Sequence, residues 1–114
     1  MRILDISDER FDTALELFSQ GISFSFNKVD FYLDKNTNVL SVSSTSNWRL
    51  KNLDNTKALM ELERVKTTFD FIKFNRPAFA DLIQGVCTRF SLVSDYGTGT
   101  VEVCHLEDNK LIWN

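Results

Sequence analysis

The chain has 114 residues, 43% of them hydrophobic and 25% charged, which is the size of one domain and excludes a disordered or fibrous protein. Thirteen basic and sixteen acidic residues give a net charge of −3, which disfavours a nucleic-acid partner. No apolar stretch approaches the ~18 residues of a membrane span, and no signal-peptide pattern follows Met1. We therefore expect a cytoplasmic protein without a membrane partner.

The N-terminal residues indicate a short strand followed by a helix. Residues 2–6 are suited to the strand, and Ser7 can cap the helix that follows it. Asp8 and Glu9 then occupy the first turn, where the helix dipole favours acidic side chains. Gly21 ends the pattern. The apolar residues recur at the spacing of one helix face: Phe11, Ala14, Leu15 and Phe18.

From Ile22 the apolar residues recur at every second position, which predicts strands over 22–26, 29–33 and 40–43. The polar run 34–38 is rich in turn formers and predicts an antiparallel hairpin between the second and third of these strands. A turn at Asn27–Lys28 would extend the hairpin to a three-stranded meander.

The middle of the chain is helical. After a polar loop, Asp54 or Asn55 can cap a long helix that runs to about Asn75. Its apolar stripe consists of Ala58, Leu62, Val65, Phe69 and Ile72. Arg76 and Pro77 end this helix, and Pro77 suits the first turn of a short third helix.

Three further strands are predicted over 88–95, 100–106 and 110–113, with glycines at a turn between the first two. The order of elements predicts a single α+β domain spanning 1–114. We expect an antiparallel or mixed sheet of about five to six strands, packed against two to three helices on one face.

No motif predicts a catalytic residue, a cofactor or a metal ligand. Cys104 and His105 are adjacent on a strand, so their side chains point to opposite faces and form no dyad. Cys87 with His105 remains an alternative if their strands pair, but we interpret both cysteines as buried thiols. The chain lacks the ligand spacing of a zinc or calcium site, and its glycines lack the strand-to-helix context of a phosphate loop.

Two features indicate a protein-binding surface. The first is a concentration of negative charge on the first helix, contributed by Asp8, Glu9, Asp12 and Glu16. The second is a pair of aromatic residues in polar connections, Trp48 and Tyr96. The alternatives are a solvated helix face for the carboxylates and an anchor between loop and core for Trp48.

We interpret the chain as a small acidic protein-binding module and not as an enzyme. The most concrete version is a bacterial immunity or inhibitor protein, which neutralises a toxin, such as a basic nuclease, by covering its active site. One alternative is a ligand-binding domain or enzyme with a pocket between sheet and helices, near Cys87, His105 or Asp95. The other is a self-assembling subunit, with homodimer formation through its strands.

Overall fold

The structure is a computed structural model that describes the backbone of residues 4–5, 11–21, 23–46, 54–96 and 99–114. Side chains are described for 11–21, 23–44, 54–93 and 101–114. The elements in chain order are β1 (Leu4–Asp5), α1 (Phe11–Ser19), β2 (Phe24–Phe26), β3 (Val29–Asp34), β4 (Val39–Ser46), α2 (Asn55–Asn75), α3 (Pro77–Leu82), β5 (Cys87–Tyr96), β6 (Gly99–Glu107) and β7 (Lys110–Trp113).

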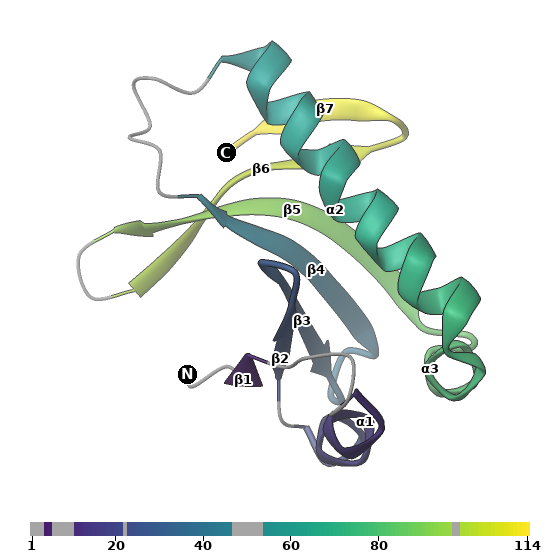
Figure 1. The fold of residues 1–114 in the computed structure, drawn as a ribbon. Helices are drawn as coiled ribbons and strands as arrows, with labels where there is room; N and C mark the ends of the chain where they lie inside the picture. The colour runs from purple at the N-terminus through teal and green to yellow at the C-terminus, as the bar shows by residue number, and fades with distance from the viewer. Residues whose placement is uncertain (1–3, 6–10, 22, 47–53, 97–98) are drawn as a thin grey trace.

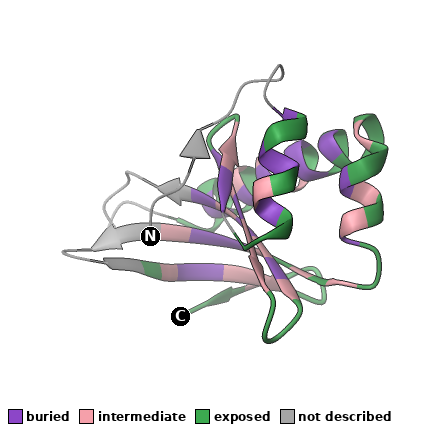
Figure 2. Cartoon of the chain, turned by 90° about the horizontal axis from the view of Figure 1, so that it is seen from below, coloured by how far each residue is buried: buried purple, intermediate pink, exposed green. Residues whose placement is uncertain are grey.

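The strands form one mixed sheet in which the spatial order is the chain order, from β1 to β7 (Figure 1). β1 and β2 are parallel and connected through α1, and β4 and β5 are parallel and connected through α2 and α3. Both crossovers step across the sheet in the same direction. Because such crossovers are right-handed, they place all the helices on the same face (Figure 2). The predicted α+β sheet with helices on one face is confirmed.

The predicted meander is also confirmed. β2, β3 and β4 pair antiparallel in sequence. The connection between β2 and β3 consists of Asn27 and Lys28, with φ of 51° and 60°. Two consecutive residues with positive φ form a type I′ turn, whose twist matches that of the flanking strands.

The sequence predictions for the ends of α2 are confirmed. α1 is described from Phe11, and its predicted cap Ser7 lies outside the described residues. α2 begins as predicted after Asp54, whose Oδ1 accepts a hydrogen bond of 2.8 Å from the Lys57 N–H. It ends as predicted at Asn75, because Arg76 precedes the proline and has non-helical backbone angles.

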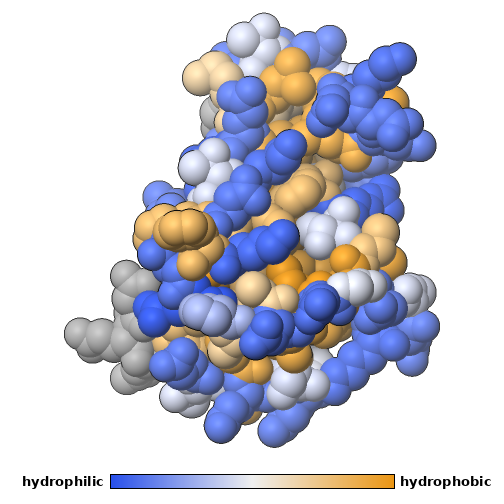
Figure 3. All heavy atoms as spheres, turned by 90° about the vertical axis from the view of Figure 1, so that its right-hand side faces the viewer, coloured by the Kyte–Doolittle hydropathy of each residue, from blue (hydrophilic) through white to orange (hydrophobic). Residues whose placement is uncertain are grey.

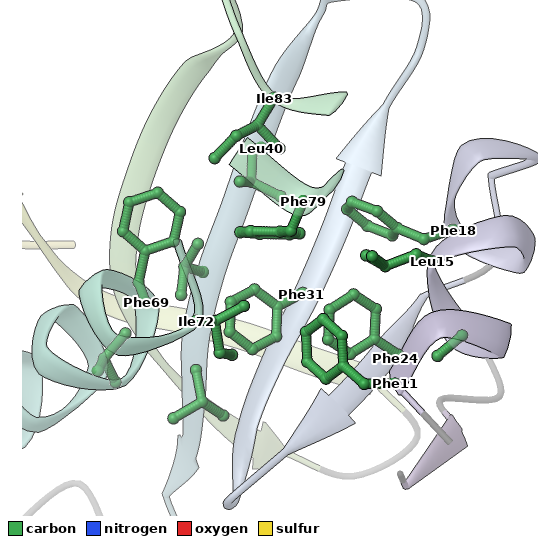
Figure 4. Packing of buried hydrophobic residues seen from close by; sticks show 14 residues of the cluster. Phe11, Leu15, Phe18, Phe24, Phe31, Leu40, Phe69, Ile72, Phe79 and Ile83 are labelled. Carbon is green, nitrogen blue, oxygen red and sulfur yellow. The ribbon is translucent and has the colours of Figure 1, made fainter. Parts of the chain in front are cut away.

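Phe79 of α3 occupies the centre of the main core (Figure 4). Its side chain is 0% exposed, and its ring centroid lies 6.0–6.4 Å from those of five other phenylalanines. These rings come from α1, β2, β3 and α2: Phe11, Phe18, Phe24, Phe31 and Phe69. The short helix α3 therefore holds α1, the meander and α2 together around one side chain.

A second, smaller cluster lies where the N-terminal half of α2 crosses the other end of the sheet. Ala58 and Leu62 of α2 pack there with Leu92 of β5 and Cys104 of β6. Leu111 of β7 is partly buried against this cluster. In the described part of the chain, no helix is long and apolar enough to span a membrane.

Candidate protein-binding groove beside helix α2

Two of the ten phenylalanines project into solvent from α2. Phe71 is 55% exposed and Phe74 is 87% exposed, whereas Phe69 and Phe79 beside them are at most 6% exposed. Burying a phenylalanine side chain contributes roughly 1.5–3 kcal/mol. Because Phe71 and Phe74 are exposed, they do not contribute this free energy to folding. Exposed aromatic side chains that lie close together are typical of a surface that binds a partner.

A groove runs between this side of α2 and the hairpin of β2 and β3. One part of it, of about 480 Å³, is lined by Phe26, Asn27, Thr67, Thr68 and Phe71. The second part, of about 360 Å³, is lined by Phe11, Phe26, Phe71, Ile72, Asn75 and Arg76. Phe26 and Phe71 line both parts, so the two depressions are neighbours along the same side of α2. Figure 3, which faces the helix layer, shows hydrophobic side chains gathered between hydrophilic ones on this surface.

Arg64 fixes one wall of the groove. Its guanidinium donates to the carbonyl oxygens of Asn27, at 3.0 Å, and Lys28, at 3.3 Å, in the turn between β2 and β3. The same side chain donates to Glu61 Oε1 at 2.6 Å and to Ser44 Oγ at 2.9 Å. A single planar side chain therefore connects α2, the turn and β4, which holds Asn27 opposite Thr67 across the groove.

Glu61 completes this network. Its Oε1 also accepts a hydrogen bond of 2.7 Å from the hydroxyl of Ser44, a residue that is 2% exposed. The Arg64 hydrogen bonds lower the pKa of Glu61, and the Ser44 hydroxyl lowers it further, although partial burial opposes them. Glu61 is thus held as a carboxylate, the form that Arg64 requires.

Charged residues of both signs lie at the end of the groove that is next to the C-terminus of α2. The Arg76 guanidinium lies 5.2 Å from the centre of the Phe11 ring and covers its face. Asp12, the next residue of α1, is exposed, and so is Glu16 one turn later. Asp70, beside Phe71 on α2, is also exposed.

The structure therefore locates only some of the residues that the sequence indicated as partner-binding. Asp12 and Glu16 are exposed on α1, near the groove end formed by Phe11. Asp8, Glu9 and Trp48 lie outside the described residues. Tyr96 is the last residue of β5, and its side chain is not described.

Phe71 and Phe74 are not among the residues that the sequence indicated as partner-binding. A signal was present, because these two residues fall outside the apolar stripe of α2 that contains Phe69 and Ile72. A stripe of buried residues occupies only one side of a helix. Large apolar residues off that stripe must therefore be exposed or contact another element.

A second polar constellation lies on the helix-free face of the sheet. The strand register shifts between Leu92 and Val93, so β6 has one extra residue, Val103. This bulge moves Glu102 to the same face as His105, whose Nδ1 lies 3.1 Å from Glu102 Oε1. Arg89 of β5 pairs with Glu102 at 2.5 Å. The other ring nitrogen of His105, Nε2, lies 3.4 Å from Glu107 Oε2, so this cluster contains two carboxylates and one arginine.

The two cysteines lie in different environments. Cys104 is 0% exposed on the helix face, and burial raises the pKa of its thiol to about 11. The prediction that Cys87 is also buried is wrong, because the start of β5 is exposed. His105 pairs with Ser91, four residues further along β5 than Cys87. Four residues of strand span roughly 13 Å, so Cys87 and His105 form no dyad.

No family model, curated protein or solved structure matches this chain. Among the described residues, no group of three or more His, Cys, Asp and Glu side chains is placed to hold a metal ion. The function is therefore argued from the groove and the surface around it.

Proposed function

We propose that this chain is a protein-binding module whose groove beside α2 receives an apolar segment of its partner. The observation that carries this proposal is the exposure of Phe71, which is 55% exposed and lines the groove, together with Phe74, which is 87% exposed and lies three residues further along α2. Clustered aromatic residues that become desolvated in a complex supply most of the binding free energy in many interfaces. Thr67, Asn27 and Asn75 supply polar groups along the same surface.

The charge distribution supports a basic partner. Asp12 and Glu16 are exposed on α1, and the whole chain carries a net charge of −3. Exposed carboxylates near an apolar contact surface speed the encounter with a positively charged partner by long-range attraction. The groove then provides the short-range contacts that keep the partner bound.

The finer version of this proposal is a bacterial immunity or inhibitor protein that covers the active site of a toxin, such as a basic nuclease. Carboxylates such as Asp12 and Glu16 would take the place of substrate phosphates, and Phe71 and Phe74 would provide the apolar anchor. The support for this version is the combination of exposed acidic and aromatic residues near one groove.

The proposal is tested by affinity capture from the native host with matched variants. The wild-type chain is expected to retain one stoichiometric partner, whereas Phe71→Ala/Phe74→Ala loses it. Val101→Ala serves as the control, because Val101 is also 50% exposed but lies on β6. Equal retention of the partner by the double variant would place the interface elsewhere.

The inhibitor version has its own test on the purified complex. If Asp12 and Glu16 steer a basic partner, the association rate falls as salt is raised from about 0.05 to 0.5 M. Asp12→Asn/Glu16→Gln should be slower at low salt and less sensitive to salt. An association rate that is independent of salt excludes steering. A partner without toxin or nuclease activity excludes the inhibitor version and leaves the binding module intact.

A further inference from the structure

Strand β7 forms one end of the sheet, with β6 on its inner side. In the described part of the chain no strand lies on its outer side, and Figure 2 shows this strand at the rim of the molecule, next to the C-terminal mark. An edge strand directs backbone N–H and C=O groups outward at alternate residues, where another strand can pair with them.

The turn between β6 and β7 determines which residues point outward. Asp108 and Asn109 have φ of 50° and 63°, the conformation of a two-residue type I′ turn. In such a hairpin the two flanking residues exchange both of their backbone hydrogen bonds. Glu107 and Lys110 are these flanking residues, and they are partners in the register.

Hydrogen-bonded and non-hydrogen-bonded pairs alternate along an antiparallel ladder, so Ile112 also directs its backbone groups toward β6. The Asn114 N–H continues this pattern with a bond of 3.0 Å to the Val103 carbonyl. Leu111 and Trp113, which lie between these positions, therefore direct their N–H and C=O groups to the outer edge.

The side chains of β7 are apolar on both faces of the sheet. Ile112 is 37% exposed on the helix-free face, and Trp113 is 39% exposed on the helix face. Edge strands are usually protected from pairing by charges, prolines or bulges. Between Lys110 and Asn114, β7 has none of these.

We propose that β7 pairs antiparallel with β7 of a second copy of this chain, about a two-fold axis that passes between the two Ile112 residues. In this register Leu111 of each copy faces Trp113 of the other, so every outward N–H and C=O of both residues gains a partner. Lys110 lies opposite Asn114, so no like charges meet.

The alternative symmetric register, with Leu111 opposite Leu111, places Trp113 opposite Asn109. Asn109 belongs to the turn and has a left-handed backbone, which does not continue the ladder. In the Ile112 register, by contrast, the outward N–H and C=O groups of both Leu111 and Trp113 form hydrogen bonds. It also sets the two Ile112 side chains opposite each other in a non-hydrogen-bonded pair, where cross-strand contacts are closest.

This dimer does not rest on the proposed function. Residues 26–27 of the groove lie on β2 and its turn, near the opposite end of the sheet from β7. Both grooves of a dimer therefore remain accessible. A pair of four-residue strands forms a small interface, so the dimer is expected to dissociate in roughly the micromolar range.

Sedimentation velocity of the full chain tests the proposal. Between about 5 and 500 µM the wild-type chain should shift from monomer to dimer. Ile112→Lys and Ile112→Glu should each raise the dissociation constant roughly tenfold or more, because like charges then oppose each other. An equimolar mixture of the two variants should dimerise again. Val101→Lys is the control for an added charge on β6, and circular dichroism checks the fold of each variant.

A cross-linking experiment determines which register the two β7 strands adopt. Ile112→Cys in a Cys87→Ser background should give a disulfide-linked dimer on oxidation, because the facing Cβ atoms lie within bonding range. Trp113→Cys in the same background should cross-link far less. A wild-type chain that stays monomeric over the whole concentration range overturns the proposal. So does a dimer that is unaffected by both Ile112 charge variants.

Discussion

Arg64 is the side chain through which α2 and the β2–β3 turn hold their positions. Its guanidinium bonds to two turn carbonyls and to Glu61 and Ser44, while its side chain is 35% exposed. A lysine carries the same charge but presents no planar fork of donors. The shape of the groove wall therefore depends on the guanidinium and not merely on a positive charge.

We expect Arg64→Lys to lower the free energy of unfolding by about 1–2 kcal/mol, because turn carbonyls and the Ser44 hydroxyl lose a donor. Urea denaturation at pH 7 measures this change. Lys66→Arg, at a partly buried position on the same helix, is the matched control and should change stability little. If Arg64→Lys were as stable as the wild-type chain, the positive charge alone, without the guanidinium hydrogen bonds, would account for the contribution of Arg64 to stability.

Glu61 gives this network a pH dependence. Its pKa in the folded chain is lowered from 4.5, first by the Arg64 hydrogen bonds. A lowered folded-state pKa adds stability above the unfolded value, and this contribution is lost as the pH falls through the folded value. The stability difference between the wild-type chain and Glu61→Gln should therefore be constant from pH 7 to about 5 and shrink below 4.5. Urea denaturation at pH 7, 5 and 3.5 measures it, and a difference that grows at low pH would contradict this account.

The two thiols should differ strongly in reactivity. Cys87 is exposed, whereas Cys104 is buried and the pKa of its thiol is raised to about 11. Because the thiolate is the reactive form, iodoacetamide at pH 8 should label Cys87 and leave Cys104 unlabelled until urea unfolds the chain. Peptide mass spectrometry distinguishes the two sites. Rapid labelling of Cys104 in the native chain would mean that the second core cluster opens readily.

At the scale of elements, the β2–β3 turn combines a favourable geometry with an unfavourable residue. Lys28 adopts a φ of 60°. In this left-handed conformation its Cβ lies unfavourably close to the following carbonyl oxygen. The type I′ turn favours glycine at this second position, as in an Asn-Gly sequence. The backbone carbonyl of residue 28, which accepts from Arg64, is retained in any substitution.

Lys28→Gly is accordingly expected to stabilise the chain by about 1 kcal/mol, since glycine adopts positive φ without strain. A shift of the urea midpoint to higher concentration measures the gain. Lys35→Gly, at an exposed position of the next turn, is the control and should not stabilise. Destabilisation by Lys28→Gly would indicate that the lysine side chain itself contributes to the fold.

α2 differs from an ordinary surface helix because it has apolar residues on two sides. Ala58, Leu62 and Val65 belong to its buried stripe, whereas Phe71 and Phe74 project away from the core. The hydrophobic spacing of the sequence predicted that α2 is a helix, because its buried stripe is regular. The same reasoning does not show whether an off-stripe phenylalanine is covered by another element, because that depends on tertiary packing.

At the scale of the whole molecule, the sequence was sufficient for the fold class and the helix-covered face. The alternation of apolar and polar residues predicted the strands. The Asp54 cap predicted the start of α2, and Pro77 predicted the boundary between α2 and α3. The groove was not predictable, because it forms where Phe26 and Phe71 meet from elements far apart in the chain. The bulge that brings Glu102 beside His105 has a signal in the sequence, because the apolar residues at 101 and 103 are followed by apolar residues at 104 and 106, but the strand predicted over 100–106 did not use this change of phase.

The arrangement of the molecule separates its two proposed contact surfaces. The groove combines the C-terminal half of α2 with the β2–β3 hairpin, whereas the proposed dimer edge is β7. The sheet order places several strands between them. We therefore expect self-association and partner binding to be independent, so Ile112→Lys should bind the captured partner with unchanged affinity in a titration. A loss of partner binding by this variant would show that the two surfaces act together.

The central claim is that the groove beside α2 is the partner-binding surface. Amide hydrogen exchange of the chain, alone and in complex with its captured partner, tests this claim most directly. We expect the amides of residues 26–28 and 67–76 to exchange more slowly in the complex than in the chain alone. The exchange rates in β7 should be the same in both samples when the fraction of dimer is the same. Protection confined to the helix-free face, around Arg89 and His105, would contradict the claim and move the binding site to the opposite side of the sheet.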